Sequence, residues 1–221
     1  TAVGYVFLAV IVALSAVAFS LTTILQATND VTTYFTVLLF ILMVALPVLT
    51  MKLFSEERKM RTEQLLLTAP VSIAKIVAAK FFAAFTVFFG ANLLCSLAYI
   101  TLFIYSEPEG GIILGNIIAI TLVGASFIAV GIFVSSLTEN QLAAAIGTFG
   151  ILLAMLGVGL LSAVIPWYPV RYVLGWFSIL TRYSNFTSGF FDFAALFYYA
   201  SVCFIFLFLT CRVLERRRYS A

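Results

Sequence analysis

Residues 112–165 read IILGNIIAITLVGASFIAVGIFVSSL-TENQ-LAAAIGTFGILLAMLGVGLLSAVI, two apolar runs joined by the polar turn Thr138-Glu139-Asn140-Gln141. Neither run contains a charged residue, and each is longer than the roughly 20 residues that a helix needs to cross the hydrocarbon core of a bilayer. The stretch therefore predicts two membrane-spanning helices, at about residues 112–137 and 142–165.

The composition of the whole chain extends this prediction. Of 221 residues, 64% are hydrophobic and 10% are charged, whereas a soluble domain is about 45–50% apolar and about 25% charged. A globule cannot hide so much apolar surface, which excludes a water-soluble monomer. We expect a single all-α transmembrane domain over residues 1–221, a polytopic membrane protein with six transmembrane helices. The six spans are expected at about residues 3–25, 31–53, 73–104, 112–137, 142–165 and 192–213.

Lysine and arginine are unevenly distributed between the connections. If the N-terminus lies inside, all of the 12 basic residues except Arg171 and Arg182 fall on the cytoplasmic side. Because basic residues accumulate in cytoplasmic loops, both termini are expected in the cytoplasm. The chain begins without methionine and almost inside the first span, so we also expect that an N-terminal piece has been lost.

Several classes of function are excluded by what the sequence lacks. It has no histidine, which removes the default general base and the commonest metal ligand. The three cysteines lie in apolar runs without Cys-x-x-Cys spacing, and there is no phosphate-binding Gly-x-x-x-x-Gly-Lys-Ser/Thr run. The net charge of +3 is too small and too scattered for nucleic-acid binding. We therefore expect no enzymatic activity, no catalytic residue, no metal and no cofactor in this chain.

The most charged stretch, SEERKMRTEQLLLTAP at residues 55–70, follows the second span. Ser55 is expected to cap a helix whose first turn holds Glu56 and Glu57, and Glu57 can pair with Arg61 four residues later. Two interpretations remain open. The helix either rests on the inner headgroups as an amphipathic helix or fits a groove on a cytosolic partner.

Three patches of the sequence resemble permease subunits of type-2 ABC transporters, most closely the gliding-motility and nitrous-oxide-maturation type. The first patch reads LPVLTMKLFSEERK at residues 46–59 and continues through Thr62 and LLLTAPVS at residues 65–72. The other two are SSLTENQ at residues 135–141 and FLTCRVLERRR at residues 208–218. Together with the six-span layout, the resemblance covers most of the chain.

The resemblance implies a permease subunit, an exporter by its type, in the cytoplasmic (inner) membrane of a prokaryote. In such families a cytoplasmic coupling helix between spans two and three, here about residues 55–69, docks on a separate ATPase subunit that binds ATP and Mg. Two permease subunits, of the same or related chains, form the path. The implied ATPase contacts are Glu56, Glu57, Arg58, Thr62, Leu65 and Leu66, and the Glu139-Asn140-Gln141 turn would lie nearby at the cytoplasmic face.

Two further points follow from the same comparison. Residues 166–191 would form outer re-entrant helices between spans five and six. Where the family commonly reads Gly-Thr-x-Glu, this chain reads Arg61-Thr62-Glu63-Gln64, so Gln64 replaces the usual acid. The alternative function is a membrane scaffold or assembly factor that moves nothing. An intramembrane enzyme and a channel are disfavoured, because the spans carry no paired carboxylates and no charged ring.

Overall fold

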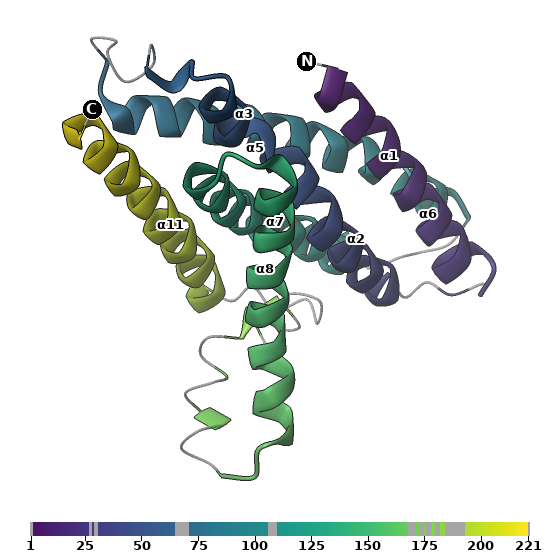
Figure 1. The fold of residues 1–221 in the computed structure, drawn as a ribbon. Coiled ribbons are helices and arrows are strands. Elements are labelled where there is room, and N and C mark those ends of the chain that lie inside the picture. Colours follow the sequence, from purple (N-terminus) through teal and green to yellow (C-terminus); the bar gives the residue numbers. More distant parts are fainter. Residues whose placement is uncertain are drawn as a thin grey trace.

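The computed structural model describes residues 2–26, 28, 31–64, 71–105, 110–167, 171–172, 175, 178–179, 182–183 and 193–220. The regular elements in these ranges are helices, so the all-α prediction is confirmed (Figure 1). In chain order they are α1 (Ala2–Phe19), the π-helix η1 (Ser20–Ile24), α2 (Thr32–Thr50), α3 (Lys52–Lys59), α5 (Ile73–Ser96), α6 (Tyr99–Tyr105), α7 (Gly110–Leu137), α8 (Gln141–Val164) and α11 (Phe193–Ser220).

Six stretches of the described helices are long and apolar enough to span a membrane, as the sequence predicts. They are Gly4–Ile24, Thr32–Lys59, Ile73–Ile104, Gly110–Leu137, Gln141–Leu161 and Phe193–Arg218. The third is interrupted at Leu97 and Ala98, where the Leu97 amide bonds to the Leu94 carbonyl and the helix tightens between α5 and α6. The sixth runs beyond the expected end at residue 213, because α11 continues to Ser220.

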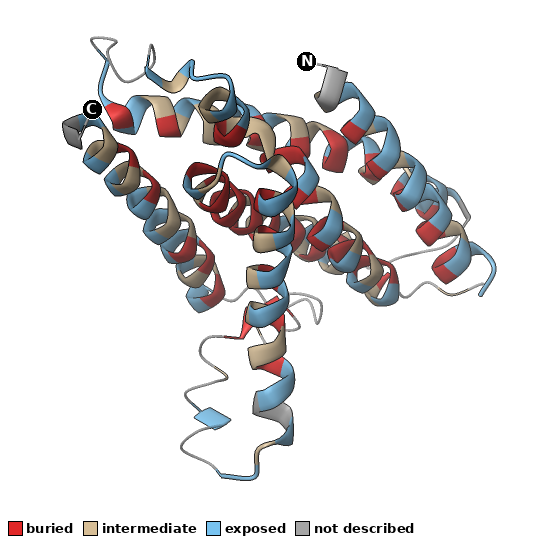
Figure 2. Cartoon of the chain, viewed as in Figure 1, coloured by how far each residue is buried: buried red, intermediate tan, exposed pale blue. Residues whose placement is uncertain are grey.

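Helix α7 is the centre of the bundle. Of its most apolar stretch 67% is buried, against 22% for α8 and for α11. It packs against α2, α3, α5, α8 and α11 (Figure 1), and Figure 2 shows its buried surface enclosed by the outer helices. By contrast, α8 has a long exposed face, and its second half projects past the other helices. The outer helices therefore carry most of the exposed apolar surface of the bundle.

Two glycines allow neighbouring helices to approach α7 closely. A Cβ atom at Gly131 would lie 2.1 Å from Thr50 Oγ1 on α2, and one at Gly124 would lie 2.2 Å from the Phe88 ring on α5. Thr50 is fully buried, and its hydroxyl donates to the Leu46 carbonyl at 3.0 Å, so it has little freedom to retreat. Small residues at helix contacts of this kind are a main determinant of packing inside membranes.

The two ends of the bundle differ in chemistry. We call the end that carries α3, the Thr138–Asn140 turn and the last turns of α11 the basic end; α1 also begins there (Figure 1). Toward the other end lies a buried group of tyrosines, in which Tyr34 shares a 2.6 Å hydrogen bond with Ser15 and its ring lies 5.9 Å from that of Tyr99. Charged side chains thus characterise the basic end of the bundle, and buried aromatic side chains characterise the opposite end.

Part of the predicted outer segment 166–191 is described. Its Tyr183 is buried and donates a 3.0 Å hydrogen bond to the Phe35 carbonyl on α2, and the Ile179 carbonyl accepts one from Tyr199 on α11. Burial raises the pKa of the Tyr183 phenol, so this donor keeps its proton at neutral pH. The expected re-entrant helices fall largely outside the described residues.

The close approach at Gly131 predicts a measurable cost of one methyl group. Gly131→Ala should lower the free energy of unfolding by about 1–3 kcal/mol relative to Gly150→Ala, because the new Cβ overlaps Thr50. Gly150 is the matched control, since its Cβ would meet nothing within 4 Å and both changes bring the same gain in helix propensity. Denaturant unfolding of the purified chain in detergent measures the difference; equal stability of the two variants would contradict the packing described.

Candidate functional site

A serine on α7 holds α3 against the bundle. The Ser135 hydroxyl oxygen accepts hydrogen bonds from the backbone N–H groups of Phe54, at 3.1 Å, and Ser55, at 3.2 Å. The same hydroxyl donates to the Met51 carbonyl at 3.0 Å. Ser135 has no exposed surface, so this one side chain serves three buried backbone groups at the junction of α2 and α3. The start of α3 is therefore fixed from another helix.

The expected N-cap at Ser55 is wrong. Helix α3 begins at Lys52, directly after α2, and Met51 between them keeps helical dihedral angles. Ser55 consequently lies inside the helix, fully buried, and its hydroxyl donates back to the Met51 carbonyl one turn earlier. The local preference of serine for a cap is overridden because the chain arrives already helical from α2.

The predicted coupling helix at 55–69 is also divided. Helix α3 ends at Lys59, residues 60–62 form a turn, and Glu63 and Gln64 are helical again. Arg61 has a φ of 57°, a left-handed conformation that is uncommon for arginine and turns the chain. The expected Glu57–Arg61 pair does not form, because Glu57 bonds to Lys80 instead. Residues 65–69, including Leu65 and Leu66, lie outside the described residues.

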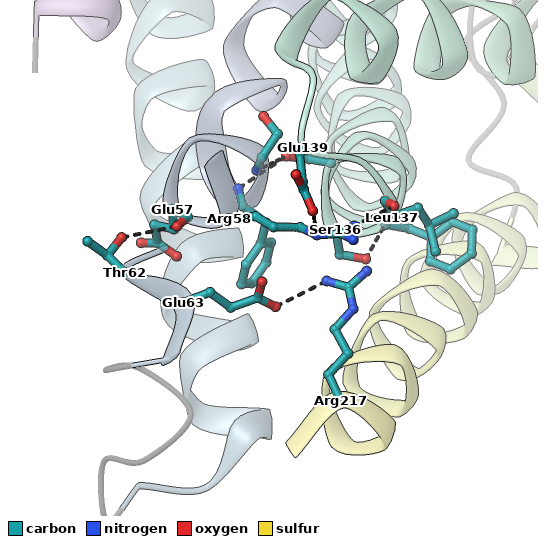
Figure 3. A network of polar contacts seen from close by, with 12 residues as sticks. Glu57, Arg58, Thr62, Glu63, Ser136, Leu137, Glu139 and Arg217 are labelled. Atoms are coloured by element: carbon teal, nitrogen blue, oxygen red, sulfur yellow. Dashed lines mark hydrogen bonds and ion pairs between the residues drawn. The ribbon is translucent and has the colours of Figure 1, made fainter. Parts of the chain in front are cut away.

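Arg58 joins α3 to the turn between α7 and α8. Its Nε lies 2.9 Å from Glu139 Oε1, and its Nη1 donates to the Leu137 carbonyl at 2.8 Å (Figure 3). The turn itself is ordered by Asn140, whose side-chain oxygen accepts from the Leu142 amide at 2.9 Å and so caps α8. Two of the residues predicted from the sequence, Arg58 and Glu139, are thus brought into direct contact.

Glu57 joins α3 to α5. Its Oε1 lies 2.6 Å from the Lys80 ammonium, which also donates to the Leu53 carbonyl and lies 4.4 Å from the centre of the Phe54 ring. The Lys80 side chain is only 17% exposed, and Glu57 Oε2 is buried without a hydrogen-bond partner. A lysine inside an apolar span is thereby neutralised by an acid from α3, which is how charges at the membrane boundary are usually tolerated.

Glu63 provides a third connection, to α11. Its carboxylate lies 3.1 Å from Arg217 Nη1, and the two side chains are 13% and 26% exposed (Figure 3). In the stretch where Gln64 replaces the acid that the resembling family carries, the neighbouring Glu63 makes the ion pair. The Thr62 hydroxyl donates to the Glu57 carbonyl at 3.2 Å and helps to close the turn that presents Glu63.

The sequence-predicted contacts therefore separate into two groups. Glu57 and Arg58 face the protein and hold α3 in place, whereas Glu56 and Thr62 are exposed. Sequence reasoning missed Ser135 and Lys80 as partners of α3, and it missed the pairing of Glu63 with Arg217. The sequence signals for these contacts were weak. They were the serine pair Ser135-Ser136 near the end of an apolar run, and Lys80, which lies about two turns inside the span that begins at Ile73.

The outer side of α3 is polar and accessible. Glu56 and Lys59 are exposed, and Met60 is 69% exposed just after the helix. Beside it a hollow of about 460 Å³ lies between Lys59 and residues 139–142, lined by Glu139, Asn140, Gln141 and Leu142. The surface thus offers charged groups, an exposed methionine and a concavity in one place.

Comparison with known proteins identifies no related family or protein. A scan against models of protein families finds no match, and a search of curated proteins finds no similar sequence. Among the described residues, no three His, Cys, Asp or Glu side chains come together in a way that could hold a metal ion. The contacts of α3 connect it to α5, α7 and the α7–α8 turn, and Glu63 just after it connects the same segment to α11.

Two adjacent serines test the anchoring of α3. Ser135→Ala should lower the free energy of unfolding by about 1–3 kcal/mol, because it removes the side-chain acceptor of the Phe54 and Ser55 amides and one of the two hydroxyl donors to the Met51 carbonyl. Ser136 is equally buried, but its hydroxyl donates only within its own helix, to the Phe133 carbonyl, so Ser136→Ala should cost clearly less. Unfolding curves of the two variants in the same detergent measure the difference. Equal losses of unfolding free energy would contradict the role of Ser135.

Proposed function

We propose that this chain is the membrane-spanning permease subunit of an ATP-driven ABC transporter, an exporter of the cytoplasmic membrane of a prokaryote. ATP and Mg act on a separate cytosolic ATPase subunit. The observation that carries the proposal is α3, which is tied to α5, α7 and the α7–α8 turn on one side and is exposed on the other. Glu63, just after α3, adds an ion pair with Arg217 on α11. If a partner displaces a helix in this position, the displacement is transmitted to the several spans that the helix contacts.

The mechanical route follows from the contacts. Displacement of α3 moves Ser135 on α7 through two backbone hydrogen bonds and moves the start of α8 through Arg58 and Glu139. Because α3 follows α2 with only Met51 between them, the same displacement also tilts α2. In this proposal, closure of the ATPase pair moves α3, and these spans then alternate the access of the path.

The alternative placement of α3, resting on lipid headgroups, is less well supported. An interfacial amphipathic helix buries its apolar face in the bilayer. Here the apolar residue Phe54 is 3% exposed and packs inside the protein, whereas the exposed positions Glu56 and Lys59 are charged. This distribution favours a partner of matching polarity in the cytosol. With that partner, the basic end and both termini face the cytoplasm, in agreement with the positive-inside rule.

Helix α8 of this chain offers a suitable surface for contact with the second permease subunit. Ile146, Leu153 and Leu160 are 70%, 52% and 64% exposed at seven-residue intervals. Gly150 and Gly157 lie between them with open space at their Cβ positions. Such a face permits close contact between helices in a membrane. We propose that α8 faces the second subunit across the translocation path.

Purification of the native complex tests the proposal. The chain, extracted from its own membrane in a mild detergent, should carry a protein with a phosphate-binding P-loop in stoichiometric amount. Met60→Asp, which changes only an exposed side chain, should weaken that association while the unfolding of the chain stays unchanged. A stable native complex without any P-loop ATPase would contradict the permease function and favour the scaffold.

Exchange of the Arg58 and Glu139 charges tests whether α3 is coupled through the α7–α8 turn. Arg58→Glu or Glu139→Arg alone places like charges together, so each should reduce several-fold the ATP hydrolysis that the purified complex supports. The double variant restores an ion pair but not the hydrogen bond from Arg58 to the Leu137 carbonyl, so it should recover activity in part. A double variant that is no better than the single ones would exclude this route.

A further inference from the structure

A large apolar groove lies on the outside of the bundle, between α1 and α2. It has a volume of about 770 Å³ and is lined by residues from Val6 to Leu14 on α1 and from Val37 to Lys52 on α2. Every lining residue except Lys52 is apolar. Phe7, Ile11 and Leu49 are 6%, 2% and 8% exposed and form its floor. The groove is thus a long apolar surface depression whose only charged lining residue is Lys52.

The groove is long enough to cross the hydrocarbon layer of one leaflet of a bilayer. The helix from Val37 to Lys52 is roughly 22 Å long at about 1.5 Å per residue. The hydrocarbon layer of one leaflet is roughly 15 Å, half of the core thickness of about 30 Å. Val10, Val44 and Val48 form its walls and are 48%, 58% and 46% exposed, so the groove opens sideways to lipid. An extended acyl chain fits along it with its headgroup at the basic end.

Among the residues that the structure describes, none is paired with Lys52 as a counter-charge. Its ammonium makes no hydrogen bond or ion pair with any described residue. The neighbouring acids are taken by other bases, since Glu57 pairs with Lys80, Glu63 with Arg217, Glu139 with Arg58 and Glu215 with Arg212. Glu56 lies one turn further along α3, yet no ion pair joins it to Lys52. A positive charge therefore stands unpaired at the mouth of an apolar groove.

We propose that this groove binds an anionic phospholipid of the leaflet at the basic end. One acyl chain lies between α1 and α2, and the lipid phosphate pairs with the Lys52 ammonium. Apolar contact along the groove holds the chain, and the charge selects anionic over zwitterionic headgroups. Because the groove borders α2, which leads directly into α3, the bound lipid supports the segment that carries the coupling surface. The lipid site does not depend on the proposed function.

Photolabelling of the full chain in phosphatidylcholine nanodiscs tests the site. Phosphatidylglycerol and phosphatidylcholine probes carry the same diazirine in one acyl chain, and labelled peptides are located by mass spectrometry. In the wild-type chain the anionic probe should label residues 40–48 roughly fivefold more than the zwitterionic one, as one lysine near a membrane surface is expected to provide. Lys52→Gln should bring this ratio to about one. Lys75→Gln, an exposed lysine at the same end on α5, should leave it unchanged.

Three results would overturn the proposal. Equal labelling by the two probes in the wild-type chain would exclude a headgroup-selective site. A preference that persists in Lys52→Gln would place the selectivity elsewhere. Absence of labelling at residues 40–48 by either probe would show that no lipid acyl chain enters the groove. Unfolding temperatures of both lysine variants equal to that of the wild type verify that the fold is intact.

Discussion

The Ser135 hydroxyl, buried on the central helix α7, bonds to three backbone groups at the start of α3. The other contacts of the basic end depend on this arrangement. With α3 held at that angle, Arg58 reaches the turn after α7, Glu57 reaches Lys80 on α5, and the chain that leaves α3 delivers Glu63 to Arg217. Buried hydrogen bonds inside a membrane protein are costly to leave unmade, so the serine determines where a polar helix can sit.

This arrangement explains how one short helix can serve a whole bundle. A free amphipathic helix at the surface could move without consequence for the spans. Helix α3 follows α2 directly and is bonded to α5, α7 and the α7–α8 turn, and Glu63 in the segment after it is bonded to α11, so displacement of α3 is shared by most of the protein. The charged groups act mainly as internal ties, and the exposed Glu56, Lys59 and Met60 remain for a partner. The division between holding and docking residues is the structural basis of the proposed coupling.

Hydropathy predicts the helical class and the six spans, because a bilayer forces each crossing segment to be a long apolar helix. It does not predict how the helices contact one another. The Ser55 cap failed because the helix continues from α2, and the Glu57–Arg61 pair failed because Lys80, distant in sequence, lies closer. Ser135 resembles any other serine in an apolar run. Its role depends on the close approach of α2 and α7 at Gly131, which is a property of the assembled bundle.

Hydrogen–deuterium exchange of the α3 amides, in the purified protein, tests the central claim most directly. If Ser135 and the ion pairs tie α3 to the bundle, the amides of Ser55 to Lys59 should exchange slowly, within about tenfold of those in the neighbouring part of α7. Those amides should open together with that part of α7, since locally stable regions exchange as cooperative units. Exchange of α3 within seconds, while α7 stays protected, would show that α3 is a free surface helix and would contradict the account.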